Sequence, residues 1–120
     1  MSEGITHTGG YHGTSFMSAR RILGHGFNAK GRPVFFAPLD PEGLAHAKEM
    51  GRTRAELLGE ERFSIIEAAF GATKQDYDSI GRPQIEIPAD EARYIRVMGF
   101  TLDFPTLQEV LDVTDPAHRL

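Results

Sequence analysis

Tyr11-His12-Gly13-Thr14-Ser15 is the stretch on which the predicted fold depends. Its glycine carries no Cβ, so a ligand can approach the backbone closely beside the histidine. Thr14 or Ser15 can cap a helix that begins at the next residue. A helix start offers backbone N–H groups to a polar or anionic group. The stretch therefore predicts a strand that turns into a helix, with a binding site at the junction.

The rest of the chain has short strands and few helices. Residues 1–10 are polar and rich in Gly and Thr, so a loose lead-in is expected before a short first strand around Tyr11 and His12. Periodicity and turn residues then predict a helix over 16–23 closed by glycines at 24 and 26, a loop over 28–33 and a strand over 34–37. A second helix is expected from Asp40 to about Met50, with a further turn or two over 54–58, followed by a strand over 62–70 and a long loop over 71–83. The last predicted elements are a strand over 84–87, a turn over 88–91, a strand over 94–100 and a weak helix over 104–113. This pattern is typical of an α+β domain built around antiparallel sheet.

Composition excludes several classes of protein. The chain has 120 residues, which suggests one domain, and it contains no cysteine, so disulfides, zinc–thiolate sites and thiol nucleophiles are excluded. No apolar run approaches the roughly 18 residues needed to span a bilayer, and no secretory leader is visible. The five histidines show no ligand spacing, so no metal site is predicted.

The net charge of −4 disfavours non-specific binding of nucleic acid over a broad surface. The charge is uneven along the chain. Residues 1–60 carry seven Lys and Arg against six Asp and Glu, whereas residues 61–120 carry six against eleven. The second half is therefore acidic, and a local basic patch remains possible in the first half.

The order of these motifs resembles the ADP-ribosyltransferase superfamily, specifically its His–Tyr–Glu branch. The resemblance rests on Tyr-His-Gly-Thr-Ser at 11–15, Pro-Val-Phe-Phe-Ala at 33–37, and Gln-Ile-Glu-Ile at 84–87 followed by Tyr-Ile-Arg-Val at 94–97. It covers about residues 11–100 of a single domain spanning 1–120. It implies two small, mainly antiparallel sheets with helices after the first and second strands. It also implies NAD as co-substrate.

The resemblance assigns roles to individual residues. His12 would hold the NAD ribose, the backbone of Gly13 would bind the nicotinamide amide, and Thr14 takes the small hydroxyl position. Phe35 stands where the family has a tyrosine that packs on nicotinamide, and a phenyl ring keeps the stacking face. Tyr11 and Phe36 would help to enclose the nicotinamide ring. His46 lies near the place of a second aromatic residue, and Arg20 could meet the pyrophosphate.

The catalytic position of the third motif has two candidates. Glu86 is the only carboxylate in the 84–87 strand, and Gln84 precedes it on the same face. An alignment with a gap could instead place Gln84 at the catalytic position. Breaking the bond between nicotinamide and ribose creates an oxocarbenium-like charge that a carboxylate can stabilise. We therefore expect Glu86 to be the catalytic residue.

The expected function is mono-ADP-ribosyl transfer from NAD to an acceptor that the sequence does not identify. A protein, a nucleic acid, a small molecule or water could accept the group. Such a domain suits a bacterial toxin or effector, delivered without its own signal peptide, or a cytoplasmic modifying enzyme. An immunity or inhibitor protein would be a further partner of a toxin, and no membrane partner is expected.

Three alternatives stay open at this point. An RNA 2′-phosphotransferase-like enzyme also consumes NAD, and Arg52 and Arg54 could hold RNA phosphate. A non-catalytic member of the same fold would keep the pocket without the chemistry. A hydrolase that pairs His12 with Thr14 or Ser15 is disfavoured, because residues so close in sequence seldom orient each other and no elbow motif is present.

Overall fold

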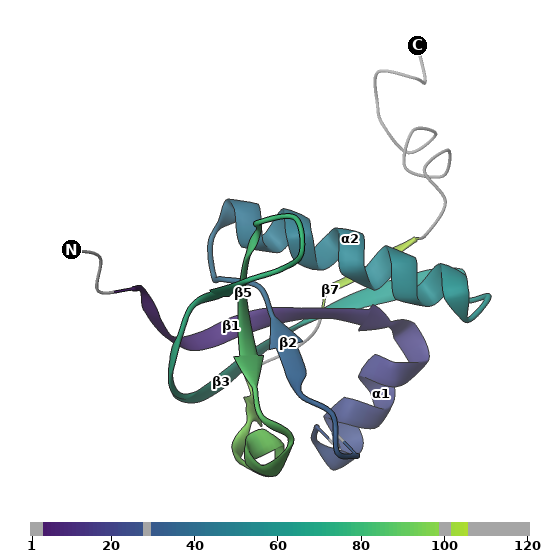
Figure 1. Ribbon diagram of the computed structural model, residues 1–120. Helices are drawn as coiled ribbons and strands as arrows, with labels where there is room; N and C mark the ends of the chain where they lie inside the picture. The colour runs from purple at the N-terminus through teal and green to yellow at the C-terminus, as the bar shows by residue number, and fades with distance from the viewer. Residues whose placement is uncertain (1–3, 28–29, 99–101, 106–120) are drawn as a thin grey trace.

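The computed structural model describes residues 4–27, 30–98 and 102–105, and Figure 1 shows their arrangement. The fold is α+β, with two antiparallel sheets and few helices. One sheet has the order β1-β3-β6, with β7 also paired to β3, and the other has the order β2-β5-β4. The strands are β1 (Thr6–Ser15), β2 (Val34–Phe36), β3 (Arg62–Lys74), β4 (Asp76–Tyr77), β5 (Pro83–Ile87), β6 (Arg96–Val97) and β7 (Leu102–Pro105).

Two α-helices follow the first two strands, as the sequence predicted. Helix α1 (Phe16–His25) begins at Ser15, whose hydroxyl accepts a hydrogen bond from the backbone N–H of Ser18 at 3.2 Å. Helix α2 (Pro41–Leu57) begins at Asp40, whose carboxylate accepts from the N–H of Gly43 at 2.6 Å. Helix α2 is continuous to Leu57, so the two helical segments predicted around Met50 and 54–58 form one element.

Strand β1 corrects the expectation of a loose lead-in over 1–10. It begins at Thr6 and pairs with the long strand β3, with a register shift between His7 and Gly9. A Cβ on Gly9 would lie 2.9 Å from the Ala68 carbonyl oxygen. The glycines that suggested a flexible segment therefore allow close packing within a strand.

The C-terminal half differs from the prediction in three places. The predicted loop 71–83 is shorter, because β3 continues to Lys74 and β4 pairs with β5. The predicted turn 88–91 is part of the 3₁₀ helix η1 (Ala89–Tyr94), and only Arg96–Val97 of the predicted strand 94–100 is a described strand. Phe104 lies in β7 rather than at the start of a helix, and 106–113 lies outside the described residues.

Two apolar cores lie on opposite faces of β3, because successive strand side chains alternate. Ile66 and Ala68 face a core that joins the two sheets to α1, whereas Phe63 and Ile65 face α2. The face of α2 against β1 and β3 consists of small buried residues spaced four apart: Gly43, Ala47, Gly51 and Ala55. This spacing places them on one side of the helix and brings its backbone close to β1. Among the described residues, no helix has the length and apolar character needed to cross a membrane.

Candidate functional site

The two sheets are joined by a single-residue bridge between β1 and the end of β2. The N–H of Tyr11 donates to the Ala37 carbonyl at 2.8 Å, and the N–H of Ala37 donates to the Tyr11 carbonyl at 2.8 Å. Every second residue of a strand directs its N–H and C=O to the same edge. The backbone groups of Gly13 therefore point toward the side of β1 that faces β2, just beyond the bridge.

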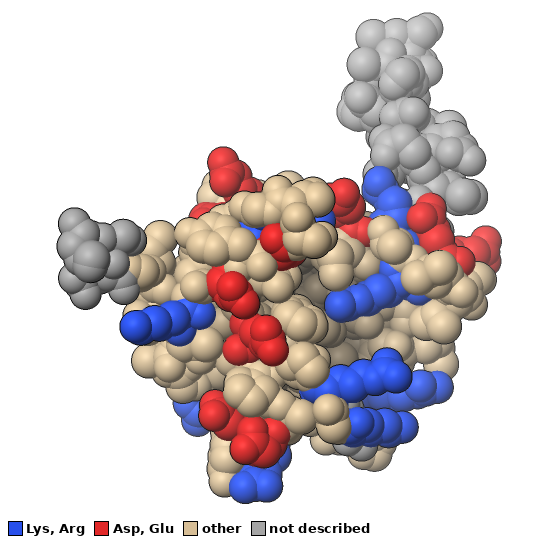
Figure 2. Space-filling view, viewed as in Figure 1, with Lys and Arg blue, Asp and Glu red and all other residues tan. Residues whose placement is uncertain are grey.

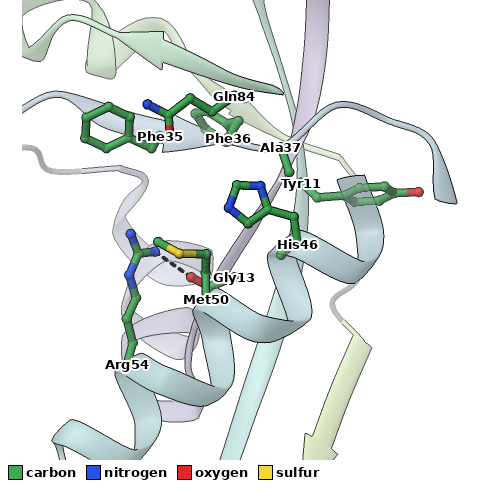
Figure 3. A pocket seen from close by; sticks show the side chains of 10 residues that line it. Tyr11, Gly13, Phe35, Phe36, Ala37, His46, Met50, Arg54 and Gln84 are labelled. Atoms are coloured by element: carbon green, nitrogen blue, oxygen red, sulfur yellow. Dashed lines mark hydrogen bonds between the residues drawn. The ribbon is translucent and has the colours of Figure 1, made fainter. Parts of the chain in front are cut away.

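A small hollow lies between β1, β2, β5 and α2 at this point, as Figure 3 shows. Phe35 from β2 and Gln84 from β5 form one wall, and α2 forms the opposite wall with His46, Met50 and Arg54. The volume is about 20 Å³, which is room for about one water molecule. A planar ring could occupy the hollow only after one of the side chains at its rim moved.

Arg54 is the charged side chain in the lining of this hollow. Its Nη1 donates a hydrogen bond to the carbonyl oxygen of Gly13 at 2.5 Å. Burial lowers the pKa of the Arg54 guanidinium. Arg54 also borders a second hollow on the other side of Phe35. A change in its rotamer would therefore free the Gly13 carbonyl and direct the positive charge toward the second hollow.

His12 is held as a neutral imidazole. Its Nδ1 lies 2.9 Å from the Phe35 carbonyl oxygen. A carbonyl can only accept, so Nδ1 carries the proton and Nε2 keeps a lone pair. Burial, reinforced by the charge of Arg54, lowers the pKa of His12 to about 4, although the hydrogen bond to Phe35 opposes this shift. At neutral pH, His12 can accept a hydrogen bond from a ligand hydroxyl.

We expect His12 to make the protein less stable in mild acid. In the unfolded chain its imidazole takes up a proton near pH 6.5, whereas in the folded chain it does so only near pH 4. The free energy of unfolding should be unaffected by His12 above pH 6.5 and fall by about 3 kcal/mol as the pH drops to 4. Urea unfolding across this range should show a smaller loss in His12→Asn than in wild type. The variant His25→Asn, at an exposed position, should keep the wild-type loss. An equal loss in His12→Asn would contradict the assignment.

The second hollow has a volume of about 250 Å³ and combines positive charge with apolar surface. Arg32 and Arg54 supply the charge, and His12 also lines this hollow. The remaining lining is apolar and comes from Ile22, Phe27, Pro33, Val34 and Phe35. Such a lining suits a ligand that carries both phosphate and a flat base.

The surface charge is divided across this side of the molecule. Figure 2 shows Lys and Arg side chains gathered on the right of the view, over α1 and the C-terminal part of α2, around a recessed area. Asp and Glu side chains run down the left of centre, over β5 and η1. An anionic ligand is therefore favoured on the right and a cationic ligand on the left.

The structure brings most of the predicted site residues to these two hollows, but not all. His12, Gly13, Tyr11 and Phe35 line one or both of them. Phe36 also borders the smaller hollow, yet the residue is 2% exposed and its ring packs against Phe27 and Phe70, so it belongs mainly to the core. Thr14 is buried in β1 and is absent from the lining of the described hollows.

The two candidates for the catalytic position have different surroundings. Gln84 lines the smaller hollow beside Phe35. Glu86 is exposed and lies directly opposite Phe35 in the β2–β5 pairing. Both side chains share the face of β5 that points away from Ile85 and Ile87. Glu86 is therefore a cross-strand neighbour of Phe35 but lines none of the described hollows, whereas Gln84 lines the smaller one.

Two arginines that the sequence placed in functional roles lie elsewhere. Arg20 forms an ion pair with Asp103 of β7 at 3.4 Å, and its guanidinium lies 4.6 Å from the centre of the Phe16 ring. It lines none of the described hollows near His12. Arg52 packs over the ring of Phe63 at 5.6 Å, and its Nε is buried without a hydrogen-bond partner in the described part of the chain. Neither side chain is positioned to bind a ligand beside His12.

Sequence reasoning missed the contribution of α2. Met50 was not considered, Arg54 was considered for a basic patch and for RNA phosphate, and His46 only as an aromatic substitute. These three residues are spaced four apart, so they occupy one face of the helix next to the stripe of small residues. That spacing was the signal that could have identified them. It was obscured because the helix was expected to end near Met50.

Comparisons of the chain with protein-family models, with curated proteins and with solved structures return no match. Among the described residues, no group of three or more His, Asp or Glu side chains could hold a metal ion.

Proposed function

We propose that the domain binds NAD across the two hollows and transfers its ADP-ribose, as an ADP-ribosyltransferase of the His–Tyr–Glu type. The observation that carries this proposal is the convergence of His12, Gly13 and Phe35 at the opening between β1 and β2. These three residues come from two of the motifs on which the resemblance rests. The observed element order, with α1 after β1 and α2 after β2, also fits that fold.

The smaller hollow is assigned to nicotinamide. The backbone N–H and C=O of Gly13 match the carboxamide, which has one acceptor and two donors. The face of Phe35 offers a stacking surface for the ring. Arg54 holds the Gly13 carbonyl in the structure, so nicotinamide binding requires Arg54 to leave it. The larger hollow would then receive the displaced guanidinium together with the pyrophosphate.

The ribose next to nicotinamide would lie beside Phe35, between the two hollows. The lone pair on Nε2 of His12 can accept from a ribose hydroxyl, because the imidazole is neutral at neutral pH. Glu86 stands opposite Phe35 on the neighbouring strand. Its carboxylate would stabilise the positive charge that develops on the ribose as nicotinamide leaves with the bonding electron pair.

We expect Arg54→Gln to weaken NAD binding by about tenfold or more. A hydrogen bond to a charged group contributes roughly 1.5–3 kcal/mol, and 1.4 kcal/mol corresponds to a tenfold change in affinity. Isothermal titration calorimetry with NAD and with ADP-ribose measures the effect. Arg32→Gln should weaken the binding of NAD and of ADP-ribose by a similar factor, because Arg32 lines the same hollow as Arg54.

The matched control is Arg20→Gln, which removes the arginine that the sequence had suggested for the pyrophosphate. Since Arg20 pairs with Asp103 away from both hollows, this variant should bind NAD like wild type. Loss of binding in Arg20→Gln with retention in Arg54→Gln would reverse the assignment. A wild-type protein that binds neither NAD nor ADP-ribose would contradict the proposed function as a whole.

A second candidate is an NAD-consuming RNA 2′-phosphotransferase. It is favoured by the pair of Arg32 and Arg54 beside His12, because that reaction also requires a held phosphate. Turnover of a 2′-phosphorylated RNA oligonucleotide distinguishes the candidates. If this activity exists, Arg54→Gln should abolish it and Arg52→Ala should not, since Arg52 packs on Phe63 instead.

A further inference from the structure

Among the described residues, Phe35 and Arg54 are the two whose side chains line both hollows beside His12. Phe35 is apolar, whereas Arg54 carries a positive charge and five N–H donors. In the structure one of these donors serves the carbonyl oxygen of Gly13, with Nη1 and the oxygen 2.5 Å apart (Figure 3). The position of the Arg54 side chain therefore affects both hollows at once.

The guanidinium of Arg54 has no counter-ion in the part of the chain that the structure describes. The ion pairs formed by these residues do not include it. The side chain is half-buried, and burial lowers its pKa because the charged form loses contact with water. A partly buried charge without a counter-ion is unfavourable. An anion in the larger hollow would therefore stabilise Arg54.

The carbonyl oxygen of Gly13 needs a hydrogen-bond donor on the side of β1 that faces β2. Gly13 is buried, and its backbone groups point to the same edge as those of Tyr11, which are bonded to Ala37. If Arg54 left without a replacement, a buried acceptor would remain unpaired, which is unfavourable. Departure of Arg54 is therefore favoured when a ligand brings its own donor to this oxygen.

The smaller hollow is closed to a ring while Arg54 remains on Gly13. Its volume of about 20 Å³ holds about one water molecule, and Arg54 and Met50 form its wall on α2, opposite Phe35. If Arg54 turned toward the larger hollow, it would approach the positive charge of Arg32. Like charges repel each other, so this movement is unfavourable unless an anion lies between them.

We propose that Arg54 is a specificity-determining residue, which admits a nicotinamide group only when the same site also holds a phosphate. The inference rests on the proposed binding of NAD. The exchange leaves no group unpaired, because a carboxamide N–H replaces Arg54 on the Gly13 carbonyl and phosphate oxygens replace Gly13 on the guanidinium. A ligand that has only one of these two parts breaks the bond between Arg54 and Gly13 without replacing both partners.

The site should therefore distinguish nicotinamide compounds by their phosphate. NAD and nicotinamide mononucleotide carry both a carboxamide and a phosphate, whereas nicotinamide riboside and free nicotinamide carry only the carboxamide. Nicotinamide released by the reaction would compete poorly with incoming NAD, because a ring without a phosphate meets a closed hollow. This refusal is a property of Arg54 rather than of the residues that would contact the ring.

The test measures the binding of nicotinamide to the full chain with and without ADP, by two-dimensional nuclear magnetic resonance of the backbone amides. ADP supplies phosphates but lacks the ribose next to nicotinamide, so the two probes can bind together and neither contains the bond that the transferase would break. Saturating ADP should lower the Kd for nicotinamide about tenfold or more, the value of one hydrogen bond to a charged group. Because such coupling is reciprocal, saturating nicotinamide should lower the Kd for ADP by the same factor.

Arg54→Met and Arg32→Met are a matched pair, because each removes one positive charge from the larger hollow. Of the two residues, only Arg54 also lines the smaller hollow. Without ADP, Arg54→Met should bind nicotinamide about tenfold more tightly than wild type, and ADP should no longer change this Kd. Arg32→Met should bind ADP more weakly and bind nicotinamide alone as weakly as wild type. A general loss of charge or of structure would not tighten the binding of nicotinamide.

Arg52→Met is the control for substitutions on α2. Arg52 lies two residues before Arg54 but packs over the ring of Phe63 and lines neither hollow. This variant should keep the wild-type Kd values for nicotinamide and for ADP, together with the coupling between them.

The outcomes distinguish this inference from the proposed function. Nicotinamide binding that ADP does not change, or no gain of nicotinamide affinity in a folded Arg54→Met protein, would overturn the role of Arg54 and leave the binding of NAD standing. If Arg54→Met does not fold, the coupling measured in wild type decides the inference. Coupled binding without release of nicotinamide from NAD would support the inference and contradict the transferase activity. Wild type that binds neither NAD nor ADP would overturn both.

Discussion

The variant Glu86→Gln is expected to release nicotinamide from NAD about 10²–10³ times more slowly than wild type, with little change in NAD affinity. Removal of one well-placed charge-stabilising group costs about 2.7–4 kcal/mol of transition-state stabilisation. The substitution preserves the size of the side chain and removes only its charge. Because Glu86 is exposed and pairs with Phe35 across the two strands, the change should leave the fold intact.

The assay compares kcat for nicotinamide release with the Kd for NAD in the same variant. Glu91→Gln, an exposed acid in the neighbouring η1, is the control and should behave like wild type. If wild type binds NAD but neither wild type nor Glu86→Gln turns it over, the domain is a binding module. Gln84 is consistent with that outcome, because the side chain that lines the smaller hollow is an amide and carries no negative charge. Turnover gained in Gln84→Glu would assign the catalytic position to residue 84.

The variant Gly13→Ala is expected to lower the free energy of unfolding by about 3 kcal/mol or more. A Cβ at this position would lie 1.8 Å from the carbonyl oxygen of Ala47 and 2.8 Å from the backbone nitrogen of Gly51. Both are backbone atoms of α2, so no side chain can turn aside to make room. The whole helix would have to move away from β1, and the core around Phe63 would lose contacts.

Gly24→Ala is the matched control for this prediction. Gly24 lies in the last turns of α1, and a Cβ there would meet no atom within 4 Å. Since alanine favours the helical conformation, this variant should be more stable than wild type by roughly 0.5–1 kcal/mol. Urea denaturation of both variants measures the difference. A Gly13→Ala protein as stable as wild type would show that α2 does not pack as closely on β1 as described.

Both α-helices could be predicted because their starts are determined locally. The side chains of Ser15 and Asp40 accept hydrogen bonds from free N–H groups of the first turn of their helices, and Pro41 has no N–H to satisfy. These effects do not depend on the rest of the chain. The N-terminal part of β1 could not be predicted, because its pairing with β3 and the contacts that require Gly9 and Gly10 involve residues far away in sequence. The same reason applies to β4, which consists of two residues and depends on its partner β5.

The sequence predicted residues of the candidate site from short motifs, but it did not indicate the residues that α2 contributes once per turn to the lining of the hollows. His12 and Gly13 are adjacent residues of the first motif, and Phe35 belongs to the second motif. Arg20 was suggested as a residue that could meet the pyrophosphate, but in the structure it lies on α1 and forms an ion pair with Asp103. The choice between Gln84 and Glu86 depends on which of the two reaches the hollow, and side-chain reach depends on packing rather than on strand periodicity.

The residues of the paired strands β2 and β5 have two different roles. Val34, Phe36, Ile85 and Ile87 point inward and hold the sheets together, whereas the alternate residues Phe35, Gln84 and Glu86 point toward solvent and the proposed ligand. Changes on the outward side cost little folding free energy. Evolution could therefore exchange one specificity for another on this ladder without rebuilding the scaffold, and an engineer could vary the same three positions in a library whose members still fold.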